Sequence, residues 1–89
     1  MKELNTIRSE IDAIDSELIE LFMKRMDCSR EVAEYKIAND IPVLNRARED
    51  EILGSVEARG GEYGKYAREL YKKIMELSRE LQSEIINGQ

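Results

Sequence analysis

The 89-residue sequence contains no histidine and only one cysteine, and these absences narrow the chemistry that the chain can perform. Zinc sites and paired Cys/His nucleophiles are effectively excluded, because both draw on histidine and cysteine side chains. A lone cysteine cannot form an intrachain disulfide, so we expect a cytoplasmic, reducing compartment. Cys28 itself falls on an apolar helical face, where we expect a small buried hydrophobe.

Long apolar runs and an excess of positive charge are also missing. The sequence has no stretch of about 18 apolar residues, so we expect no membrane-spanning helix. Its first residues lack the apolar block of a signal peptide. The formal net charge of −5 argues against a nucleic-acid partner, because phosphate backbones are bound by clustered positive charge. Charged residues make up 37% of the chain and hydrophobic ones 42%, which is typical of a soluble protein rich in exposed helix.

Proline and glycine are scarce, and their positions divide the chain into helices. The sequence before Pro42 contains neither residue, so one long helix is predicted there, ending at the turn around Pro42. Asn45 is a good N-cap for a second, shorter helix, and Gly60 and Gly61 end that helix. Strand-like alternation is absent, so the predicted fold class is all-α, with three helices in the order long, short, long. The predicted helices cover about residues 4–38, 46–58 and 62–86 of a single domain at 1–89.

An apolar seam follows the first predicted helix in alternating steps of three and four residues. Its members are Leu4, Ile7, Ile11, Ile14, Leu18, Leu21, Cys28, Val32 and Tyr35. A helix of about 35 residues is about 50 Å long, whereas a compact chain of this size has a diameter of about 30 Å. The helix must extend beyond its own core, so we expect a second copy to cover the seam in an intertwined homodimer. The alternative is a monomer with a bent helix, although no glycine or proline would cause the bend.

Arg25 takes the seam position where a buried leucine is expected. Lys36 follows it by 11 residues and lies only about 20° around the helix, so both side chains can reach one anionic ligand between them. Arg8 also adjoins the seam, but it lies about 25 Å from Arg25 along the helix. Arg8 would therefore need to come from an antiparallel partner chain. The alternative for each residue is a cation at the edge of a helix interface, with its charge in water.

Further polar residues interrupt the apolar faces of the other two helices. Ser78 and Gln82, four residues apart, point inward on the third helix. The alternative to a binding role is polarity near the helix end or an interhelical hydrogen bond. Asn45, Arg48 and Glu49 begin the second helix, and an acidic residue is favourable there in any case. Together with Arg25 and Lys36, these side chains predict a pocket for a dianionic ligand. Any catalysis in such a pocket would depend on positioning and electrostatics.

Four segments of the sequence, taken together and in order, resemble a known family. The segments are IRSEIDAIDSELIELFMKRM, VAEYK, IPVLNRAREDEIL and MELSRELQ. They resemble the all-helical chorismate mutases, the AroQ class or type II. The resemblance implies an intertwined dimer that converts chorismate to prephenate by a Claisen rearrangement. It places this reaction on the route to phenylalanine and tyrosine and implies no cofactor and no metal.

The resemblance also implies roles for individual residues. Arg25 would bind a substrate carboxylate, Lys36 and Gln82 would contact the ether oxygen of the breaking bond, and Glu49 would bind the ring hydroxyl. Arg8 would reach into the partner chain's site. Asn45 departs from the family pattern, in which aspartate is frequent, so a backbone contact there would survive but a charged contact would not. The implied substrate-binding set is Arg8, Arg25, Lys36, Asn45, Arg48, Glu49, Ser78 and Gln82, and its catalytic members are Arg25, Lys36, Glu49 and Gln82.

Two other functions are compatible with the sequence. An isochorismate-pyruvate lyase would share this fold and a similar cationic pocket. A non-catalytic helical dimerisation or regulatory module would also fit, and Arg25 would then be replaceable by leucine with a gain in stability. The sequence is also compatible with either a free-standing enzyme or one domain of a bifunctional enzyme.

Overall fold

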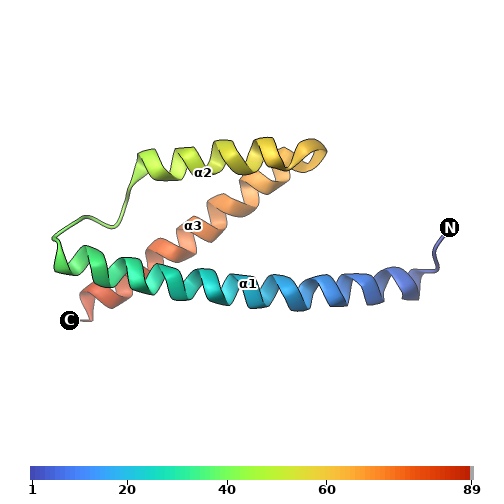
Figure 1. The fold of residues 1–89 in the computed structure, drawn as a ribbon, viewed down its shortest axis with the longest axis horizontal. Helices are drawn as coiled ribbons and strands as arrows, with labels where there is room; N and C mark the ends of the chain where they lie inside the picture. Colours follow the sequence, from blue (N-terminus) through green and yellow to red (C-terminus); the bar gives the residue numbers. More distant parts are fainter. Residues whose placement is uncertain (89) are drawn as a thin grey trace.

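The computed structural model describes residues 1–88, and all of its regular secondary structure is helical. Three α-helices follow one another, with a short 3₁₀ turn before the last (Figure 1). Their bounds are α1 Leu4–Ala38, α2 Arg46–Arg59, η1 Gly61–Tyr63 and α3 Gly64–Asn87. The prediction of an all-α fold with a long, a short and a long helix is confirmed. None of the helices within residues 1–88 combines the length and apolarity needed to cross a bilayer.

Local signals explain where the helices begin and end. Asp40 takes a positive φ of 53°, which ends α1 just before Pro42. Asn45 caps α2, and its Oδ1 accepts a hydrogen bond of 3.1 Å from the backbone N–H of Arg48. The third helix starts two residues later than predicted, because the chain first forms the η1 turn. A Cβ on Gly64 would lie 2.3 Å from the carbonyl oxygen of Glu57, so a glycine is required where α3 leaves α2.

Helix α3 is the centre of the fold. It packs against α1 on one side and α2 on the other, and the described parts of α1 and α2 do not pack on each other. The N-terminal half of α1 extends past both other helices (Figure 1). The chain measures 55 × 25 × 14 Å and has a radius of gyration of 16.3 Å, against about 12 Å for a compact chain of this length. The predicted overhang of the first helix is therefore present.

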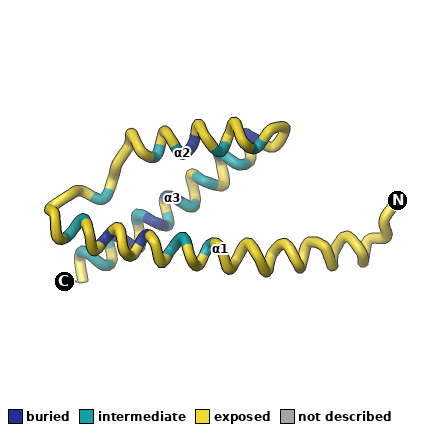
Figure 2. The backbone as a smooth tube through the Cα atoms, in the orientation of Figure 1, coloured by how far each residue is buried: buried dark blue, intermediate teal, exposed yellow. Residues whose placement is uncertain are grey.

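Little of the chain is buried, and the predicted seam faces outward. The buried apolar residues are Ala33, Leu53 and Met75. The N-terminal half of α1 is exposed along its whole length (Figure 2). Its six apolar seam residues are 38–60% exposed, namely Leu4, Ile7, Ile11, Ile14, Leu18 and Leu21. The expectation that Cys28 is buried is wrong for this chain, because α1 turns a neighbouring face, with Ser29 and Ala33, towards α3.

Candidate active site

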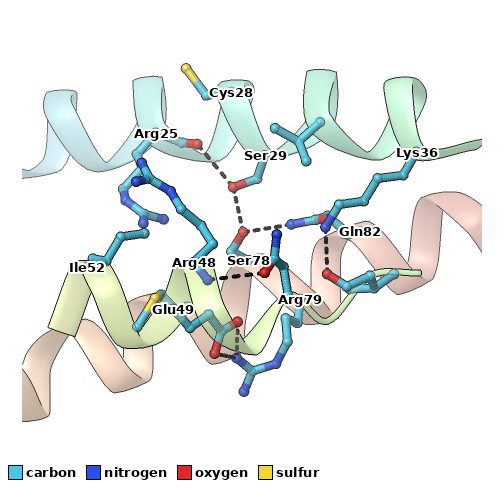
Figure 3. Close-up of a pocket in the computed structure, with 14 residues that line it drawn as sticks. Arg25, Cys28, Ser29, Lys36, Arg48, Glu49, Ile52, Ser78, Arg79 and Gln82 are labelled. Carbon is cyan, nitrogen blue, oxygen red and sulfur yellow. Dashed lines mark hydrogen bonds and ion pairs between the residues drawn. The ribbon is translucent and has the colours of Figure 1, made fainter. Parts of the chain in front are cut away.

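A pocket of about 320 Å³ lies between the C-terminal half of α1, the first turns of α2 and the C-terminal half of α3 (Figure 3). It brings together seven of the eight residues predicted to bind a ligand. These seven residues are Arg25, Lys36, Asn45, Arg48, Glu49, Ser78 and Gln82. The pocket therefore gathers residues from all three helices that are up to 57 positions apart in the sequence.

The predicted residue that the pocket lacks is Arg8. It lies on the exposed N-terminal half of α1 and does not line the pocket of its own chain. Since Arg8 precedes Arg25 by 17 residues, the two backbones are about 25 Å apart along the helix. A straight α1 therefore keeps Arg8 away from this pocket.

Arg25 and Lys36 enter the pocket from the same face of α1, as their spacing predicts. Arg25 is half-buried, and its guanidinium carbon lies 5.8 Å from the centroid of the Tyr71 ring on α3. This distance is within the range of a cation–π interaction. Arg25 therefore rests on an aromatic ring at the edge of the pocket.

Lys36 is held at the other end of the pocket by two acceptors. Its Nζ donates to the carbonyl oxygen of Val43 at 2.5 Å and to Oε1 of Gln82 at 3.2 Å. Burial lowers the pKa of Lys36, and the nearby negative charge of Glu49 partly opposes this shift. The loop around Pro42 thus completes the site, because it carries the Val43 carbonyl back to α1.

Gln82 and Ser78 form a hydrogen-bonded pair one helical turn apart on α3. Nε2 of Gln82 donates to Oγ of Ser78 at 3.0 Å, and Oγ of Ser78 lies 2.6 Å from Oγ of Ser29 on α1. All three side chains are buried. Their inward orientation was predicted for Ser78 and Gln82, but Ser29 was missed. The signal that points to Ser29 is its spacing of seven residues, or about two turns, from Lys36.

Glu49 is held by a residue that the sequence reasoning also missed. Nη1 of Arg79 on α3 lies 2.5 Å from both carboxylate oxygens of Glu49 on α2. Both side chains are largely shielded from solvent, with exposures of 32% for Arg79 and 22% for Glu49. Arg79 directly follows Ser78, but nothing in the sequence pattern indicated that it would face α2.

Arg48 is the most exposed of the pocket's cations. Its side chain pairs with Glu51 on the same helix at 2.7 Å, and both members are more than 60% exposed. Such a surface pair is worth about 0–1 kcal/mol, so a ligand anion can draw the guanidinium away from Glu51. Asn45, beside it, uses its side-chain oxygen for the α2 cap.

The pocket carries more positive than negative charge. Four cationic side chains line it, and Glu49 is the carboxylate among its lining residues. The lining also includes the side-chain amide of Gln82 and the hydroxyl group of Ser78. Within residues 1–88, no group of three or more His, Cys, Asp or Glu side chains is placed to hold a metal ion. The arrangement suits a small molecule with two separated anionic groups, held by charged hydrogen bonds.

Comparisons with known proteins identify the family of this chain. The sequence model of chorismate mutase type II matches residues 7–83. The T-protein of Haemophilus influenzae is 40% identical over 53 residues, which cover 60% of this chain and 14% of that protein. The bifunctional chorismate mutase/prephenate dehydratase of Aquifex aeolicus is 30% identical over 91 residues, which cover 96% of this chain and 25% of that protein. No solved structure matches the chain significantly.

The chain thus spans about a quarter or less of the length of these two relatives. The family match, in contrast, runs through all three helices and includes every residue of the pocket. It also contains Arg8, which the pocket of a single chain lacks. By this match over residues 7–83, the chain belongs to the chorismate mutase type II family.

Proposed function

We propose that this chain is a chorismate mutase that rearranges chorismate to prephenate in the biosynthesis of phenylalanine and tyrosine. The observation that carries the proposal is the pocket itself, in which Arg25, Lys36, Glu49 and Gln82 converge in a chain of the type II family. The enzyme would be a cytoplasmic isomerase that works without a cofactor.

The proposed chemistry matches the side chains that line the pocket. A Claisen rearrangement is pericyclic, so it requires neither a nucleophile nor a proton transfer. The enzyme must instead hold chorismate in its compact reactive shape, and Arg25 and Arg48 would do so by binding the two carboxylates. Ser78 would lie beside a carboxylate, and Glu49 would accept a hydrogen bond from the ring hydroxyl.

Lys36 and Gln82 would act on the bond that breaks. Negative charge grows on the ether oxygen as the C–O bond lengthens, so donors aimed at this oxygen bind the transition state better than the ground state. Gln82 directs Oε1 to Lys36 and uses one N–H of Nε2 for Ser78. Its second N–H is then available for the ether oxygen beside the Lys36 ammonium group.

We further propose that the active unit is a homodimer in which the partner chain supplies Arg8. The exposed apolar seam on α1 supports this proposal, since six large apolar side chains in a row are costly to leave in water. The distance argument supports it too, because Arg8 lies about 25 Å from Arg25 in its own chain. A second, antiparallel α1 would cover the seam and bring Arg8 to the pocket.

The proposal is tested by incubating the protein with chorismate, following the loss of its ultraviolet absorbance and identifying the product. We expect prephenate. We expect Arg25→Ala to be strongly impaired and Arg30→Ala to be close to wild type, because Arg30 is exposed on α1 outside the pocket. A parallel incubation with isochorismate would reveal a lyase by the release of pyruvate. No turnover of either compound would refute an enzymatic function and favour a dimerisation or regulatory module.

A further inference from the structure

The interface between α1 and α3 contains a continuous row of hydrogen bonds that ends on the backbone of α1. Ser29, Ser78 and Gln82 are its buried members, with exposures of 6%, 8% and 6%. Oγ of Ser29 lies 3.2 Å from the carbonyl oxygen of Arg25, and Lys36 binds the opposite end of the row at Gln82 (Figure 3). We call this row, from Lys36 to the Arg25 carbonyl, the interhelical relay.

The chemistry of the Lys36 end determines the direction of the first two bonds in the relay. A lysine ammonium can only donate, so the Gln82 atom that faces it is Oε1, and Nε2 must donate to Ser78. Ser29 donates its single hydrogen to the carbonyl oxygen of Arg25. With the hydrogen of Ser29 on this carbonyl oxygen, the 2.6 Å contact between the two hydroxyls uses the hydrogen of Ser78. Gln82, Ser78 and Ser29 then each accept one hydrogen bond within the relay and donate one.

We propose that Ser29 is a positioning residue that holds the side-chain amide of Gln82 in its active orientation. By accepting the hydrogen of Ser78, Ser29 keeps a lone pair of the Ser78 hydroxyl directed at Nε2 of Gln82. The second N–H of Nε2 then faces the pocket beside the Lys36 ammonium group. This inference rests on the proposed function, because Gln82 is the donor proposed for the ether oxygen.

Removing the Ser29 hydroxyl creates a conflict at Gln82. The hydrogen of Ser78 loses its acceptor on α1, and the Ser78 residue is only 8% exposed. The other acceptor within the relay is Oε1 of Gln82, which Lys36 already uses. A turn of the amide towards Ser78 would bring Nε2 against the ammonium group, with two donors facing each other. The amide therefore loses its single orientation.

The decisive comparison uses two alanine variants of the same helix. Ser29→Ala removes the relay hydroxyl, and Ser16→Ala is the matched control, because Ser16 also donates to the carbonyl four residues earlier, at 3.1 Å, but is exposed. We expect kcat to fall about five-fold in Ser29→Ala, the equivalent of one ordinary hydrogen bond, with KM nearly unchanged. Ser16→Ala should match wild type in both constants.

A double variant separates positioning from a general structural effect. In a Gln82→Ala background, Ser29→Ala should cause no further loss of kcat, because the group that Ser29 positions is already absent. Equal losses in the two backgrounds would overturn the inference, as would wild-type kcat in Ser29→Ala. Either result would leave Ser29 as a buried serine that only provides hydrogen bonds to neighbouring polar groups.

A spectroscopic measurement covers the case in which the wild-type protein does not turn over chorismate. The side-chain amide of Gln82 should give two distinct nitrogen-bound proton signals by NMR, and these should shift or broaden in Ser29→Ala but not in Ser16→Ala. An inactive wild type with this response would refute the proposed function while supporting the positioning of Gln82. Unchanged Gln82 signals in Ser29→Ala would overturn the inference whatever the activity.

Discussion

The proposed dimer makes a quantitative prediction that two impaired variants test together. Arg8→Ala removes the guanidinium assigned to the partner's pocket, and Lys36→Ala removes the ammonium group inside the chain's own pocket. Arg8 lies outside the pocket of its own chain and about 25 Å along α1 from Arg25. Each variant alone should damage both sites of a symmetric dimer, because every site then lacks one of the two groups.

Mixing the two variants should restore activity by a predictable amount. Random association of equal amounts gives about one half heterodimers, and each heterodimer has one complete site and one site that lacks both groups. The mixture should thus reach about one quarter of wild-type kcat per chain. The remaining homodimers add little, because every site in them lacks one charged donor, and such a loss lowers kcat by about 10²–10³.

The assay is the loss of chorismate absorbance after the two variants are unfolded in urea and refolded together. A mixture of Arg25→Ala and Lys36→Ala is the matched control, because both residues belong to the same chain's pocket and no heterodimer has a complete site. This control should show no recovery. Activity of the Arg8→Ala and Lys36→Ala mixture that stays at the level of the separate variants would refute a partner-supplied Arg8, as would full activity of Arg8→Ala alone.

Three further predictions concern the pocket and the turn between α2 and α3. Lys36→Met should lower kcat by about 10²–10³. It should change the unfolding free energy by no more than about 1 kcal/mol, because the lost hydrogen bonds are offset by the removal of a desolvated charge. The control Lys24→Met, which lies outside the pocket on the same helix, should leave kcat unchanged, and a normal kcat in Lys36→Met would contradict the mechanism. Because burial lowers the pKa of Lys36, activity should fall as the pH rises through this pKa, and Glu49→Gln should move the fall to lower pH by removing the charge that raises it. Over the same interval the unfolding free energy should rise with pH, since the unfolded lysine holds its proton more tightly; a fall displaced to higher pH in Glu49→Gln would contradict this electrostatic coupling. In urea titrations, Gly54→Ala should raise the unfolding free energy by about 0.5–1 kcal/mol, because its Cβ meets open space in a helix. Gly64→Ala should lower it by about 1–3 kcal/mol because its Cβ would collide with a backbone carbonyl of α2, and similar effects of the two substitutions would argue against that contact.

Much of the candidate site could be predicted from the sequence because its residues break regular patterns. Arg25 interrupts an apolar seam, and the side chain of Lys36, 11 residues later, points to nearly the same side of the helix. Helical periodicity alone therefore placed both residues on one face. Asn45 was recognised as a cap from its place before a helix, and its hydrogen bond to Arg48 confirms it. The resemblance to the chorismate mutases added the correspondence with Ser78 and Gln82.

The residues that were missed or misplaced share one physical cause. Ser29 and Arg79 have no local signature, because each matters only through the side chain that another helix places opposite it. Cys28 was expected to be buried because it lies on the apolar seam, yet the buried residues of α1 are Ser29 and Ala33 on the neighbouring face. Periodicity identifies a face of a helix, but it does not identify the partner of that face.

The sequence by itself determined the three helices and their order. Helix formation depends on hydrogen bonds between residues four apart and on the breakers near Pro42 and Gly60, and all of these are local in the chain. Only the tertiary structure decided which face of α1 meets α3, and so which side chains share the pocket. One residue step turns a helical side chain by about 100°, so a small change in the packing of two helices would put different residues opposite each other. The bond between Ser29 and Ser78 spans 49 positions of sequence and exists only because that packing selects it.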